Sequence, residues 1–131
     1  MADIGSIQGR EVPVRFKTPV FSGPAYICHA DAAYISWYWN SADTGYIIYR
    51  DGIEIFNGTT KEFRNAAKMF NNTDHDTNLF SRSHDKLIYE DDSTVLKKFH
   101  EYKYTVRAYM ETDDEGILLS AMSQPCVLRV E

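Results

Sequence analysis

Cysteine is scarce in this chain, whose 131 residues include only Cys28 and Cys126. Two cysteines are too few for the disulfide frameworks that hold small secreted domains together, so we expect free thiols in a reducing compartment. Long apolar runs are missing too: none approaches the roughly 20 residues of a membrane-spanning helix, and the N-terminus lacks the apolar core of a signal peptide. We therefore expect a protein made in the cytoplasm, without membrane insertion.

Positive charge is in deficit, with 14 Lys and Arg against 19 Asp and Glu and a net charge of −5. The basic residues are scattered, so nucleic acid is not an expected partner. Catalytic motifs are missing as well, because the sequence has no nucleophile elbow and no glycine-rich loop between a strand and a helix. The sequence thus predicts neither an enzyme nor a cofactor.

Two clusters of acidic residues and histidines resemble metal ligands at first sight. One combines the run Asp74-His75-Asp76 with the nearby His84-Asp85, and the other consists of Glu111, Asp113, Asp114 and Glu115. Neither has the spacing of a zinc site or of a calcium-binding loop. We interpret both clusters as solvated loops and predict no metal site.

Aromatic residues are abundant, at 14% of the chain, and they favour β-structure. The clearest pattern spans residues 102–109, where every second residue is apolar or aromatic: Tyr102, Tyr104, Val106 and Ala108. A period of two indicates a strand with one buried and one wet face. A second such strand is predicted over residues 33–40, and the expected shared core consists of Ile35, Trp37, Tyr46, Ile48, Tyr104 and Val106.

The turn sequence Asp51-Gly52 lies between two apolar runs and predicts a hairpin over residues 46–56. After this hairpin the pattern changes, and Phe63 and Phe70 have helical spacing.

We expect a short helix over residues 61–70 that packs these two side chains on the main body. The polar stretch that follows carries one apolar pair, Leu79 and Phe80. The sequence therefore predicts a long, partly helical insertion at about residues 58–86.

Several motifs follow one another in the order and spacing of a fibronectin type III domain. They are Pro24 before the first strand, Trp37 in the second, the run from Gly45 to Gly52 in the third, Leu96 six residues before Tyr102, and Ser120 and Ser123 before the last strand. Residues 24–131 resemble that family. The resemblance implies an all-β fold, a seven-stranded antiparallel two-sheet sandwich. Residues 1–23 precede it as an N-terminal arm, which is a departure from the family, as is the long insertion. It also implies that Tyr102 is the family's corner tyrosine.

Fibronectin type III domains serve as spacers, adhesion modules, receptor parts and appendages of bacteriophage particles, so the resemblance implies no single function. We expect a non-catalytic structural or protein–protein interaction module, a component of a larger assembly such as a bacteriophage particle and in that case virion-associated. The alternative is a carbohydrate-binding or adhesion module that uses aromatic residues on strand faces: Tyr34, Tyr38, Tyr49 and Tyr109.

The arm carries an apolar stripe that consists of Val12, Val14 and Phe16. Pro13 lacks a backbone donor, so the arm can pair through one edge only. It either adds a strand to another protein or folds back on its own sandwich, and the sequence leaves both alternatives open. The other candidate partner-binding residues are Trp39, Leu79 and Phe80.

Overall fold

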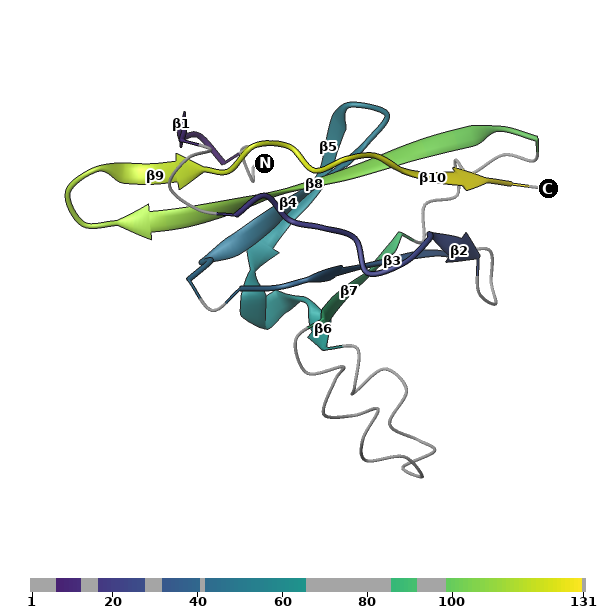
Figure 1. Ribbon diagram of the computed structural model, residues 1–131, viewed down its shortest axis with the longest axis horizontal. Coiled ribbons are helices and arrows are strands. Elements are labelled where there is room, and N and C mark those ends of the chain that lie inside the picture. The colour runs from purple at the N-terminus through teal and green to yellow at the C-terminus, as the bar shows by residue number, and fades with distance from the viewer. Residues whose placement is uncertain are drawn as a thin grey trace, which may run out of the picture.

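The computed structural model describes residues 7–12, 17–27, 32–40, 42–65, 86–91 and 99–130. These residues form two β-sheets that pack around a shared apolar core (Figure 1). The prediction of an all-β fold is confirmed. No helix in the described part of the chain has the length and apolar character needed to cross a membrane.

The larger sheet is built on β8 (Glu101–Thr112), whose length of 12 residues lets two strands share one of its edges. β9 (Gly116–Leu119) pairs with the C-terminal half of β8, and β10 (Cys126–Arg129) pairs with its N-terminal half. Apart from β10, the strands of this sheet lie side by side in the order β1-β9-β8-β4-β5. The strands are β1 (Arg10–Glu11), β4 (Gly45–Arg50), β5 (Ile53–Thr59), β8 (Glu101–Thr112), β9 (Gly116–Leu119) and β10 (Cys126–Arg129).

The smaller sheet has the order β2-β3-β7-β6. Its strands are β2 (Tyr26–Ile27), β3 (Ala33–Tyr38), β6 (Arg64–Asn65) and β7 (Lys86–Asp91). An isolated bridge between Phe21 and Trp37 continues the edge of β2 along β3, so the segment before β2 belongs to this sheet too.

Alternation along β8 follows the predicted pattern, with four side chains buried on its inner face: Tyr102, Tyr104, Val106 and Ala108. The predicted hairpin is also present between β4 and β5. Asp51 and Gly52 both have positive φ angles, 52° and 83°, as a two-residue turn of this type requires.

The core contains all six residues that the sequence analysis assigned to it, and Trp37 is completely buried. Its ring meets those of Tyr46 and Phe63 edge-on, at centroid distances of 5.5 and 5.1 Å. Phe56 stacks on Tyr89 at 5.2 Å and closes the flank beside β5 and β6. Aromatic rings therefore fill the space between the sheets on this side.

The seven-stranded, fully antiparallel arrangement differs from the structure. The described residues form ten strands, and β1 runs parallel to β9. The three additional strands are β1, from the residues before Pro24, β6, within the range predicted as a helix, and one that arises because the last strand is divided into β9 and β10.

A helix over residues 61–70 is wrong for the described part of that range. A single 3-10 turn covers Thr60–Glu62, Phe63 has extended backbone angles, and β6 begins at Arg64. Burial of Phe63 among the core rings overrides the weak helical spacing, although its packing on the main body is confirmed. Residues 66–85, including Phe70, lie outside the described residues.

A second, smaller apolar cluster lies on the other face of the larger sheet. It consists of Ile47, Tyr109 and Leu119, with Ile7, Tyr49 and Ile117 packed against it. Gly9 lies so close to β9 that a Cβ there would be 2.6 Å from the carbonyl oxygen of Ile117. Residues 7–12 thus lie against the sheet of their own chain.

Candidate functional site: a groove between two sheet edges

Of the predicted partner-binding residues, the structure describes Val12 and Trp39. The backbone N–H of Val12 donates to the carbonyl oxygen of Leu119 at 2.8 Å, which continues the pairing of β1 with β9. Trp39 is partly buried against the main core. The structure brings these two residues into no common site, and Val14, Phe16, Leu79 and Phe80 lie outside the described residues.

The four tyrosines of the carbohydrate interpretation differ in exposure. Tyr34 and Tyr109 are buried, with 3% and 4% of their surface exposed, and Tyr49 is half-buried. Only Tyr38 among the four is exposed, and Lys86 Nζ lies 5.6 Å from the centre of its ring. The prediction that these tyrosines form an exposed aromatic surface is therefore wrong for Tyr34 and Tyr109.

The acidic turn between β8 and β9 is exposed, as the solvated-loop interpretation predicts. Within the described ranges, no three His, Cys, Asp or Glu side chains gather in a metal-binding group. Residues 74–76 and His84 lie outside those ranges.

One buried polar cluster joins the two sheets. The Oδ2 atom of Asp91 accepts hydrogen bonds from Arg50 Nη1 and from the Tyr104 hydroxyl, both at 2.6 Å. Burial and the hydrogen bond to Asp91 raise the pKa of Tyr104. Burial acts to lower the pKa of Arg50, but the bond and charge of Asp91 outweigh it and raise that pKa. Because its acceptor is 4% exposed, this cluster is suited to connecting the sheets rather than to meeting a substrate.

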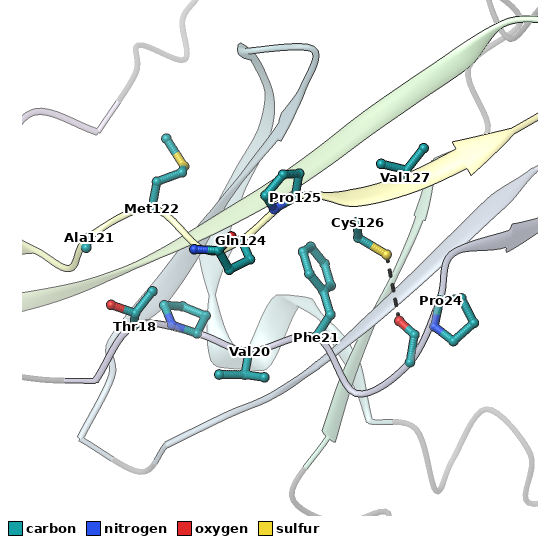
Figure 2. A pocket seen from close by; sticks show the side chains of 12 residues that line it. Thr18, Val20, Phe21, Pro24, Ala121, Met122, Gln124, Pro125, Cys126 and Val127 are labelled. Carbon is teal, nitrogen blue, oxygen red and sulfur yellow. Dashed lines mark hydrogen bonds between the residues drawn. The ribbon is translucent and has the colours of Figure 1, made fainter.

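A groove lies on the opposite flank from Phe56 and Tyr89. This groove of about 700 Å³, here called the edge groove, separates the edge of the smaller sheet from that of the larger sheet (Figure 2). One wall comes from Thr18, Pro19, Val20, Phe21, Gly23 and Pro24, and the other from Ala121, Met122, Gln124, Pro125, Cys126 and Val127.

The second wall exists because the chain leaves the β8 ladder between β9 and β10. Ser120 and Ser123 hold this detour in place: their Oγ atoms accept the N–H groups of Ala108 and Val106, each at 2.9 Å. Each hydroxyl then donates to the next carbonyl oxygen along its own chain, that of Ala121 or Gln124. The backbone N–H groups of Ser120 and Ser123 also donate to the carbonyl oxygens of Ala108 and Val106, each at 2.9 Å. The chain therefore stays attached to β8 at both serines and departs from regular strand pairing between them.

Cys126 connects the two walls. Its Sγ accepts the N–H of Ala25 at 3.2 Å and donates to the carbonyl oxygen of Gly23 at 3.7 Å, the bond drawn in Figure 2. Burial raises the pKa of this thiol, against the lowering effect of the Ala25 N–H. The thiol is therefore a structural link rather than a reactive nucleophile.

The lining of the edge groove is uncharged and partly exposed. None of its 12 residues is charged, in a chain whose charged share is 25%. Val20 and Val127 are 61% and 47% exposed, so two of the five exposed large apolar side chains among the described residues lie here. An uncharged, apolar hollow of this size is typical of a binding site.

Comparisons with known proteins give no family assignment: no protein-family model, curated protein or solved structure matches the chain.

Sequence reasoning missed the edge groove because its walls are separated by about a hundred residues along the chain. One signal was available. Three of the four prolines, Pro19, Pro24 and Pro125, line the groove, and proline marks places where strand pairing stops.

Proposed function

We propose that this chain is a non-catalytic, fibronectin type III-like module that binds another protein through the edge groove, as one component of a larger assembly such as a bacteriophage particle. The observation that carries the proposal is the combination of an uncharged lining with exposed Val20 and Val127. Burial of such apolar surface is the main favourable term in protein association.

The fibronectin type III-like part of the proposal is supported by strand arrangement. The hairpin β4–β5 lies beside β8 in the larger sheet, and β3 of the smaller sheet contributes Trp37 to the core. Ser120 and Ser123 precede the final strand, β10. These are the positions that the sequence resemblance assigns to the corresponding motifs. The carbohydrate alternative has less support, because Tyr34 and Tyr109 offer little surface for sugar stacking.

The proposal is tested by site-specific photo-crosslinking in the cells that make the protein. A photoreactive amino acid replaces Val20 in one variant and Val127 in a second. The control replaces Ile53, which is 69% exposed but lies on β5, at the far edge of the larger sheet from β10.

We expect a discrete crosslinked protein from both groove positions and none from position 53. Crosslinks at all three positions, or only at position 53, would contradict a role for the edge groove. No protein crosslinked at any position would contradict the interaction function itself.

A further inference from the structure

Phe21 lies at the free edge of the smaller sheet and lines the edge groove. The neighbouring groups pair with β3: Ser22 N–H donates to the Ser36 carbonyl at 2.8 Å, and Tyr38 N–H donates to the Val20 carbonyl at 3.0 Å. Backbone groups of successive residues in an antiparallel strand point to alternate sides. The N–H and C=O of Phe21 therefore point away from β3, at the free edge of the smaller sheet beside the groove, and no described residue pairs with them.

On the opposite wall, Val127 also has unpaired backbone groups at a sheet edge. The N–H of Val130 donates to the His100 carbonyl at 2.9 Å, so the backbone of Val130 faces β8. Backbone groups two residues apart in a strand point to the same side, so those of Leu128 and Cys126 also face β8, where these residues lie opposite Tyr102 and Tyr104. The N–H and C=O of Val127 consequently point outward at the sheet edge, where no described residue pairs with them.

Each wall thus combines a free backbone donor and acceptor with apolar side chains. An extended peptide matches this arrangement, because its backbone groups alternate between its two sides and its side chains alternate between its two faces. A charged segment does not match, because its charges would lose water without gaining a partner among the uncharged lining residues.

On the basis of the proposed function, we propose that the edge groove binds an extended, uncharged segment of the partner protein as an inserted strand. Its backbone pairs with Phe21 on one wall and with Val127 on the other, and its apolar side chains contact Val20 and Met122. Insertion of this kind satisfies two sheet edges at once, whereas a strand added to a single edge satisfies only one.

The inference is tested by selecting a display library of short random peptides on the full chain. Counterselection uses the Val20→Lys variant, which alters an exposed groove side chain, and the matched control is Ile53→Lys, which alters an exposed apolar side chain outside the groove. Selected peptides are then remade with one central backbone nitrogen methylated, which removes a single donor and keeps every side chain.

We expect enriched peptides that lack charge at their central positions and bind Ile53→Lys as they bind the original protein. They should lose binding to Val20→Lys, and methylation should weaken binding by about tenfold, the effect of one main-chain hydrogen bond. Amide resonances of Phe21 and Val127 should shift when such a peptide binds.

Four results would overturn strand insertion. They are the absence of enrichment over the counterselection, enrichment of charged sequences, equal binding of methylated peptides, which indicates a simple apolar pocket, and self-association lost in Val20→Lys, which makes a second copy the occupant. Crosslinks in cells without peptide binding would leave the interaction function standing and refute only the inserted strand.

Discussion

The two flanks of the space between the sheets are closed in different ways. Beside β5 and β6, the rings of Phe56, Phe63 and Tyr89 lie within 5.2 to 6.4 Å of one another. Beside β2 and β10, the hydrogen bonds that join the walls in the described part of the chain run through the thiol of Cys126, and the edge groove remains. One flank is sealed by side chains, and the other leaves backbone groups accessible.

This difference reflects which residues occupy each flank. Aromatic side chains each bury a large apolar surface and their rings pack edge-on, so they fill the space between the sheets. Prolines and small residues bury little apolar surface, and the chain departs from regular pairing with β8 between Ser120 and Ser123. Aromatic packing is therefore concentrated at one flank, and the proposed binding site lies at the other.

The largest expected effect comes from the sealed side. Trp37→Ala should lower the free energy of unfolding by about 3 to 5 kcal/mol, because it empties a fully buried site between Tyr46 and Phe63. Denaturant unfolding measures the change, and Ile53→Ala, at an exposed site, should remain within about 0.5 kcal/mol of the original protein. A Trp37→Ala protein that melts within a few degrees of the original would contradict this core.

The next effect concerns the polar connection between the sheets. Asp91→Asn should cost about 2 to 3 kcal/mol, because Arg50, with a side chain 17% exposed, loses its counter-charge. The comparison is Glu115→Gln, which removes the partner of exposed Arg10 and should cost less than about 1 kcal/mol. Equal costs for the two variants would mean that the buried cluster does not connect the sheets energetically.

A smaller effect is expected at the wall of the edge groove. Ser123→Ala should cost about 1 to 2 kcal/mol, because the N–H of Val106 loses its acceptor in a buried position. Chemical denaturation gives the value, and Ser123→Thr, which keeps a hydroxyl, should recover part of it. If Ser123→Ala is as stable as the original protein, the hydroxyl does not hold the detour.

The smallest effect is a pH dependence at the loop between β3 and β4. Burial raises the pKa of Asp43 above its usual 3.8, against the lowering effect of the Tyr46 hydroxyl that donates to it. As pH rises, Asp43 therefore loses its proton in the unfolded chain before it does so in the folded protein. The free energy of unfolding falls as pH rises from about 3.8 through the raised pKa. Thermal melts should show that the melting temperature of Asp43→Asn rises relative to that of the original protein as pH increases across this range. Parallel profiles would contradict the shift.

Periodicity predicted the parts of the fold that depend on neighbouring residues. It identified the buried face of β8, the hairpin at Asp51 and Gly52, and a core around Trp37. It failed where burial depends on another segment: Tyr109 lies on the outer face of its strand, yet Ile47 and Leu119 cover it. The helix predicted from the spacing of Phe63 is absent for the same reason, because packing of Phe63 among the aromatic rings of other segments favours an extended backbone.

The edge groove was beyond such reasoning because it depends on two strand edges that meet only after folding. The arm illustrates the same limit. Its sequence allowed pairing with another protein or with its own sheet, and the described residues Arg10, Glu11 and Val12 pair with β9 of their own chain. Sequence alone could not choose between equivalent edges.

Amide hydrogen exchange of the free protein, resolved residue by residue with NMR, tests most directly the claim that the two walls present unpaired backbone. We expect the amides of Phe21 and Val127 to exchange rapidly, while those of Ser22, Val106 and Ala108 are protected by their hydrogen bonds. Protection of Phe21 and Val127 as strong as that of Ser22 would contradict the account, because the edges would then already be paired.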